Sequence, residues 1–210
     1  MAARVGFTFT ETMGGFVGKG EKDFRRGSAR GRRAGERFRF KLTILADDLG
    51  AFLASPAHEA RMTGTVDSTS LGQGLEVRNA VFNLLERDES GRLWMKYRLE
   101  FTSDGGVPYV MEGFKDVHND RMLDFWYDTT ALFTEVRPAD EGAADEPSFQ
   151  GILRIRPLDL VPQVISMRAL NTRNPLRHAL ALARFGWFFF ATLVREYARP
   201  PRRAPREAPA

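Results

Sequence analysis

The sequence of 210 residues contains no cysteine and only three histidines. The absence of cysteine excludes disulfide bonds and thiol catalysis, and it is compatible with a reducing compartment. His58, His118 and His178 stand far apart, and neither an HExxH motif nor another metal-ligand spacing occurs. We therefore expect no bound metal and no cofactor.

Long apolar runs are also missing. The N-terminal residues MAARVGFTFTET lack the apolar core of a secretory signal. The most hydrophobic stretch, ALALARFGWFFFATLV at 179–194, contains Arg184 and is shorter than the roughly 20 apolar residues of a membrane span. We expect a cytoplasmic protein, with peripheral contact to a membrane as an open alternative.

Familiar catalytic motifs are absent as well. Gly18 and Lys19 resemble the end of a phosphate-binding loop, but Met13 stands where its first glycine is needed. No GxSxG serine elbow occurs. Asp124 and Asp128 share one face of an expected strand, so they form a carboxylate pair that acid/base chemistry could use. Solvent-facing acids are commoner, and the sequence favours a protein that is not an enzyme.

The formal net charge is +4, and much of the arginine excess lies at 25–39 and 195–206. The Arg/Gly-rich stretch 18–35 predicts a solvated basic loop between strands. Apart from Phe24, residues 21–35 contain no aromatic side chain on which bases could stack. We therefore expect no nucleic-acid partner.

The clearest pattern is a four-stranded meander from Leu75 to Val136. Its strands are expected at 75–86, 92–102, 107–117 and 121–136, separated by short turns rich in Gly, Asn and Asp. Along the second strand, Met95, Tyr97 and Phe101 alternate with charged residues, which is typical of a strand with one buried face.

Four more strands are expected at 5–13, 36–45, 58–66 and 149–155. A short helix begins at Asp47 or Asp48 and ends at Pro56. Two longer helices follow the strands, at 158–170 and 174–197, the second with Asn174 as its cap. The chain thus divides into a β-barrel at 1–157, a helical extension at 158–198 that packs on the barrel, and a basic tail at 199–210 that we expect to be disordered.

This order of elements predicts a mainly β fold, an antiparallel meander that closes into a calycin- or lipocalin-like barrel with two C-terminal helices. A barrel of eight strands is wide enough either to be filled by side chains or to hold one small ligand. The candidate ligand-binding residues share the inner face: Phe40, Met95, Tyr97, Phe101, Tyr109, Met111, Phe125 and Tyr127. A filled core and an apolar ligand cavity both fit this pattern.

The aromatic cluster of the last helix comprises Trp187, Phe188, Phe189 and Phe190. This helix could pack on the barrel, lie in a membrane interface beside its arginines, or dock on a partner protein. The cluster is therefore the candidate membrane or partner site.

Several stretches of the chain, in order, resemble an accessory domain associated with cholesterol-oxidase-like flavoproteins of the GMC oxidoreductase family in lipid-handling bacteria. They are FTETMGGFV, DDLGAFL, AVFNLL, YRLEFTSDGGVPYVMEGFKDV, DFWYDTTALFTEV and ARFGWFFF. The resemblance implies a role in sterol or lipid metabolism beside a flavoprotein. The GxGxxG motif that binds a dinucleotide is absent, so the chain is not expected to be the oxidase itself.

Two functions follow as hypotheses. The first is a non-enzymatic barrel that binds a lipid or a sterol-like molecule, as an accessory to a flavin-dependent oxidoreductase. The second is an interaction module that docks on a partner enzyme or a membrane through the aromatic helix.

Overall fold

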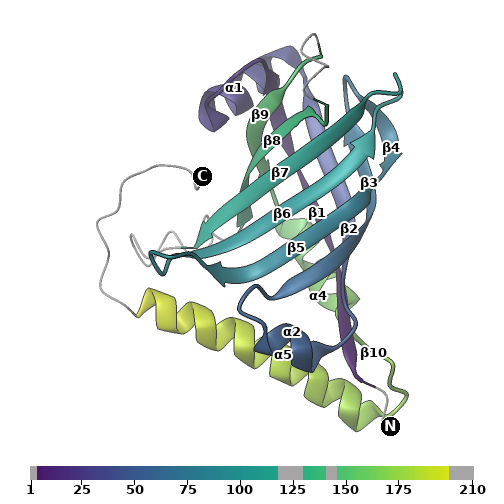
Figure 1. Ribbon diagram of the computed structural model, residues 1–210, viewed down its shortest axis with the longest axis vertical. Helices are drawn as coiled ribbons and strands as arrows, with labels where there is room; N and C mark the ends of the chain where they lie inside the picture. Colours follow the sequence, from purple (N-terminus) through teal and green to yellow (C-terminus); the bar gives the residue numbers. More distant parts are fainter. Residues whose placement is uncertain (1–3, 118–129, 141–145, 199–210) are drawn as a thin grey trace.

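The computed structural model describes residues 4–117, 130–140 and 146–198. Eight antiparallel strands form a closed barrel (Figure 1). They are β1 (Gly6–Lys19), β2 (Arg37–Ala46), β3 (Glu59–Ser68), β5 (Arg78–Arg87), β6 (Leu93–Thr102), β7 (Pro108–Val117), β8 (Ala131–Pro138) and β9 (Phe149–Arg154). Each strand pairs with the next, and β1 pairs with β9. The predicted lipocalin-like barrel is confirmed.

The barrel closes along the second half of β1. This strand pairs with β2 from Phe7 to Phe16 and with β9 from Gly14 to Lys19. A Cβ atom on Gly15 would lie 2.2 Å from the carbonyl oxygen of Ile152, so only glycine allows the two backbones to approach this closely. The glycine-rich stretch after Met13 is thus part of the strand, and the prediction that the first strand ends at Met13 was wrong.

The first strand of the expected meander is two strands. A short strand, β4 (Gly72–Glu76), pairs with β3, and β5 begins only at Arg78. Asn79 and Leu85 have positive φ angles of 44° and 52°, and the register of β5 against β6 shifts near both residues. Such bulges bend a strand without ending its pairing, and they interrupt the simple alternation of the sequence.

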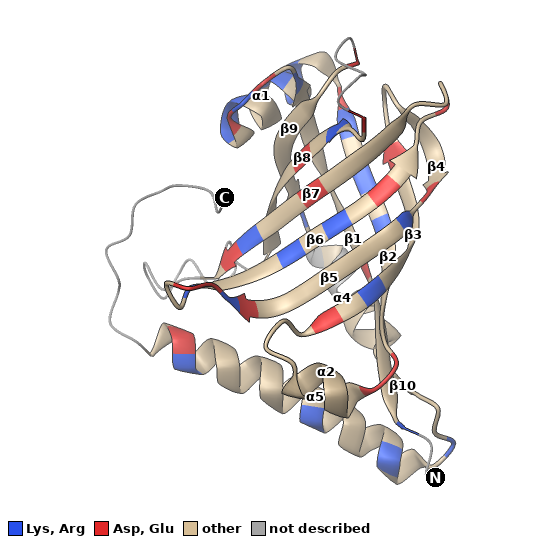
Figure 2. Ribbon diagram, in the orientation of Figure 1, with Lys and Arg blue, Asp and Glu red and all other residues tan. Residues whose placement is uncertain are grey.

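The Arg/Gly-rich stretch is not a loop, as the sequence predicted, but contains the helix α1 (Phe24–Ala34). The Asp23 side chain accepts a hydrogen bond from the Arg26 amide at the N-terminus, and Gly35 ends the helix at φ 71°. The buried residues Gly27 and Gly31 let the helix lie directly on the backbones of β9 and β1. Its arginines are exposed, and the helix lies at one end of the barrel (Figure 2).

In the described part of the chain, three helices lie toward the other end of the barrel (Figure 1). They are α2 (Leu49–Ala54), α4 (Pro157–Ser166) and α5 (Pro175–Tyr197). The predicted helix at 158–170 is too long, because Arg168–Leu170 forms β10, which pairs with the start of β1. The predicted helix at 174–197 agrees with α5, which crosses below the barrel. The expected tail at 199–210 lies outside the described residues.

The interior is filled at the α1 end. Phe101 packs between Phe38 and Tyr109, with ring centroids 6.1 and 5.9 Å away. Phe149 and Val17 are buried in the same half of the barrel. Large side chains thus pack against one another in this half of the barrel.

Candidate ligand cavity

The α5 end of the barrel is hollow. A cavity of about 250 Å³ lies there, enclosed by barrel strands and by the inner sides of α4 and α5. Most of its wall is apolar. The apolar lining residues are Phe9 of β1, Phe82 and Leu84 of β5, Met95 of β6, Ile155 after β9, Val164 and Met167 at α4, and Phe185 and Phe189 of α5. Such a pocket suits an apolar molecule, because burial of apolar surface favours binding.

A buried polar cluster interrupts the apolar wall. Glu11 of β1 and Lys115 of β7 are 3 % and 2 % exposed, and Lys115 Nζ lies 3.1 Å from Glu11 Oε1. The Tyr97 hydroxyl donates a hydrogen bond of 2.8 Å to Glu11 Oε2. The Lys115 ammonium also lies 5.2 Å from the centre of the Tyr97 ring. Each charge is therefore compensated inside a largely apolar space, as buried ions require.

Burial and the neighbouring Glu11 carboxylate raise the pKa of Tyr97 well above its usual value of 10. The phenol thus keeps its proton and acts as a donor at neutral pH. Tyr97 holds the Glu11 carboxylate in one orientation, with its other oxygen toward Lys115.

Gln163 brings α4 into the same cluster. Its Nε2 atom makes a long contact of 3.5 Å with Glu11 Oε1. Its Oε1 atom is buried and has no hydrogen-bond partner within the described part of the chain. A buried acceptor without a partner is unfavourable, so this atom offers a position for a donor supplied by a ligand.

The cavity reaches the surface beside α4. Val164 lines the cavity and is also 56 % exposed, whereas Val161, one turn earlier, is exposed but does not line it. Ser166 fixes this helix to the barrel, because its hydroxyl accepts a 2.8 Å hydrogen bond from the Thr10 amide. The mouth of the cavity thus lies at a short helix held against β1.

Aromatic contacts hold α5 across the hollow end. The Phe185 ring stacks on Phe7 with centroids 4.0 Å apart, and Phe188 packs on His58 at 4.7 Å. At the C-terminal end of α5, Glu196 pairs with Arg87 at 3.0 Å. The helix therefore forms a wall of the cavity.

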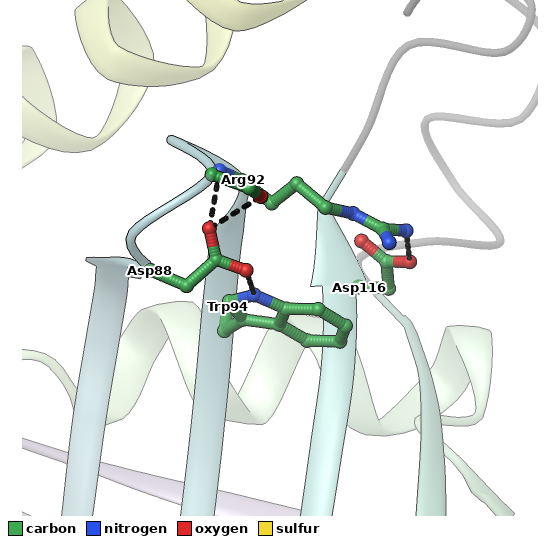
Figure 3. Close-up of polar contacts among 5 residues, drawn as sticks. Asp88, Arg92, Trp94 and Asp116 are labelled. Atoms are coloured by element: carbon green, nitrogen blue, oxygen red, sulfur yellow. Dashed lines mark hydrogen bonds and ion pairs between the residues drawn. The ribbon is translucent and has the colours of Figure 1, made fainter. Parts of the chain in front are cut away.

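Hydrogen bonds and an ion pair hold the β5–β6 turn that follows Arg87 (Figure 3). Asp88 accepts hydrogen bonds from the Trp94 indole at 2.8 Å and from the Arg92 amide at 2.9 Å. Burial alone raises the pKa of Asp88, but its hydrogen bonds from Ser90, Trp94 and Arg92 together outweigh this effect and lower the pKa to about 2. The Arg92 side chain extends to Asp116 of β7. This network fixes the turn against which α5 ends.

The predicted ligand-binding residues are divided between the two halves of the barrel. Met95 and Tyr97 line the cavity. The other four described residues are buried but belong to the filled part of the core: Phe40, Phe101, Tyr109 and Met111. Phe125 and Tyr127 lie outside the described residues, as do Asp124 and Asp128.

The aromatic cluster of α5 is also divided. Phe188 and Phe189 pack against the barrel, and Phe189 reaches the cavity. Trp187 and Phe190 point outward and are 71 % and 64 % exposed. The helix therefore closes the barrel with one side and leaves aromatic rings uncovered on the other.

The sequence analysis missed Glu11, Lys115 and Gln163. Strand parity carried a signal for two of them, since Glu11 lies on the same strand face as the buried Phe9 and Met13, and Lys115 lies on the same face as the buried Met111 and Val117. No sequence pattern indicated that Gln163 would face the barrel, because that depends on how α4 docks.

Among the described residues, no group of His, Asp or Glu side chains is arranged to hold a metal ion. In the same part of the chain, no helix is long and apolar enough to cross a membrane. Comparisons with protein-family models, curated proteins and solved structures gave no significant match. The relation to a GMC-associated accessory domain therefore stays a hypothesis, because none of these comparisons assigns the chain to a family.

Proposed function

We propose that this protein binds a small apolar alcohol in the hollow end of its barrel. The observation that carries the proposal is an apolar cavity of about 250 Å³ with one buried polar cluster in its wall. Pockets of this composition bind a ligand through its apolar body and orient it through a few polar groups.

The cavity volume sets the size of the ligand. An apolar protein cavity of about 150 Å³ can hold a benzene molecule, so 250 Å³ corresponds to a body of roughly ten non-hydrogen atoms. A medium-length hydrocarbon chain or a small terpenoid fits this space. A larger lipid, including a sterol, would fit with only one end inside and the rest at the mouth.

The polar cluster favours a neutral head group. Glu11 and Lys115 already compensate each other, so an additional carboxylate would approach Glu11 without a second cation to stabilise it. A hydroxyl group can accept a hydrogen bond from Lys115, which has two further ammonium protons, and donate one to Gln163 Oε1. An alcohol thus satisfies both groups.

Binding, rather than catalysis, is the role that these contacts support. The Glu11 carboxylate receives hydrogen bonds from Tyr97 and Lys115, so it is held as a fixed acceptor and is not poised as a free base. The link to sterols and to a flavoprotein partner rests on the sequence resemblance alone. In that setting the barrel would hold or deliver an alcohol to an oxidoreductase.

The test is titration calorimetry with three molecules of equal chain length: nonanol, nonane and nonanoate. We expect nonanol to bind more tightly than either of the others. Val164→Phe should block the mouth and abolish binding, whereas the control Val161→Phe should bind as the wild type does. The proposal fails if nonanol does not bind, or if both substitutions have the same effect.

A further inference from the structure

The outward side of α5 carries a continuous apolar stripe. It consists of Leu176, Leu180, Trp187, Phe190 and Val194, all of which are exposed. Their spacing follows the helical repeat, so the stripe runs about 27 Å along one side of the helix. Phe185, which packs on the barrel, lies on the opposite side. No described residue covers the stripe.

Arginines flank this stripe along one edge. Arg177, Arg184 and Arg195 are exposed and recur at nearly the same helical angle. The only acidic residue of α5, Glu196, faces inward and pairs with Arg87 (Figure 2). In the sequence, Arg199, Arg202, Arg203 and Arg206 follow directly. The exposed side of α5 thus combines large apolar groups with positive charge alone.

We infer that this stripe docks on the surface of an anionic lipid membrane. Amphipathic helices that lie in the membrane interface have aromatic and aliphatic groups on one side and arginines beside them. Anionic head groups supply the negative charge that α5 lacks, and the surface potential attracts each arginine. Because α5 lies flat across one end of the barrel, its full length can approach a planar surface (Figure 1).

A second copy of the chain fits the same surface less well. The stripe also has the alternating three- and four-residue spacing of a helix-pairing seam. However, α5 presents no exposed acid that could pair with the arginines of a second α5. Antiparallel pairing along the stripe would bring arginine edges together, which is unfavourable. Charge complementarity therefore selects the membrane.

Docking in this orientation would place the helix that forms one wall of the cavity against the lipid. Phe189 lines the cavity from α5, and Val164 marks its mouth on α4. Leu158, Val161 and Ile165 of the same helix are exposed as well but do not line the cavity. Membrane docking does not depend on the proposed ligand, because the stripe points away from the cavity.

The test is co-sedimentation with vesicles of phosphatidylcholine alone or mixed with an equal part of phosphatidylglycerol. We expect binding to the mixed vesicles that weakens as salt is added, since salt screens exposed charges. The double substitution Trp187→Ser and Phe190→Ser removes two exposed rings and should weaken binding at least tenfold while the thermal unfolding temperature is retained.

A matched pair of charge variants separates docking by α5 from general attraction. The first variant replaces Arg177, Arg184 and Arg195 with Gln. The second replaces Arg25, Arg26 and Arg33 of α1 with Gln and so removes the same charge. These three arginines are exposed, and α1 lies at the opposite end of the barrel. Only the first variant should lose most of its binding to the mixed vesicles.

Equal losses in the two charge variants would overturn the inference, as would an absence of vesicle binding by the wild-type protein. Sedimentation velocity can also contradict the inference. The contradicting result is a wild-type protein that does not bind vesicles but forms a dimer, and a dimer that dissociates when Trp187 and Phe190 are replaced with Ser. Nonanol binding, measured separately, shows whether the proposed ligand function stands when the membrane inference fails.

Discussion

Replacing Lys115 with Met should destabilise the protein strongly, because it leaves the Glu11 carboxylate buried without its cation. Both side chains are almost completely buried, and the two charged atoms lie 3.1 Å apart. Removal of one partner from such a pair costs about 3–5 kcal/mol in the free energy of unfolding. For a chain of this size, each kcal/mol corresponds to about 2–4 °C, so the unfolding temperature should fall by about 6–20 °C.

A surface ion pair on the neighbouring strand provides the control. Lys96 pairs with Glu86 at 3.2 Å, but these side chains are 41 % and 29 % exposed. Lys96→Met should therefore change the free energy of unfolding by no more than about 1 kcal/mol. The substitution is chemically the same, so the difference between the two variants measures the effect of burial.

The double variant Glu11→Gln with Lys115→Met tests whether the loss comes from an uncompensated charge. The amide oxygen of Gln can still accept the hydrogen bond from Tyr97, and no charge remains in the cavity. We expect the double variant to recover most of the lost stability. Urea unfolding at neutral pH gives the free energies for the complete cycle. The reasoning is refuted if Lys115→Met costs no more than Lys96→Met.

Three further predictions concern other parts of the molecule. Gly31→Ala would place a Cβ atom 2.2 Å from the Val17 carbonyl oxygen, so it should lower the free energy of unfolding by about 1–3 kcal/mol. An unchanged midpoint of urea unfolding would contradict the close packing of α1 on β1. Burial lowers the pKa of His58, whose ring packs on Phe188, so the free energy of unfolding should decrease as the pH falls below 6.5. His58→Asn should make this decrease smaller, because Asn does not titrate and tolerates the positive φ angle at this position. The raised pKa of Tyr97 should make stability fall as the pH rises above 10, and Tyr97→Phe should reduce this loss in thermal unfolding measured across alkaline pH.

The sequence predicted the barrel because most of its strands alternate simply between buried and exposed residues. Phe38, Phe40 and Leu42 of β2 show this pattern without interruption. The helix α1 was missed because arginine and glycine dominate it, and glycine disfavours a helix. Its stability comes from the packing of Gly27 and Gly31 on backbones distant in sequence, although Asp23 and Gly35 already provided capping signals.

The cavity could not be predicted in the same way. Strand parity gives the direction of each side chain, but a hollow space depends on the volumes of residues from several strands and two helices. Phe101 and Tyr97 have the same parity in β6, yet Phe101 lies in the filled half and Tyr97 lines the cavity. The two residues differ in their position along the barrel axis, and this position can be derived only when the register of all strands is known.

The position of the ion pair itself supports a role in recognition. Well-packed apolar residues are often as stabilising as a buried ion pair or more so, so stability alone does not explain Glu11 and Lys115. Their polar atoms face a space that apolar side chains could have filled, as they do in the other half of the barrel. The double variant separates these roles. If it is as stable as the wild type but binds nonanol no more tightly than nonane, the pair serves to recognise the hydroxyl group. If the preference for nonanol persists, the pair does not set specificity and Gln163 alone would have to orient the ligand.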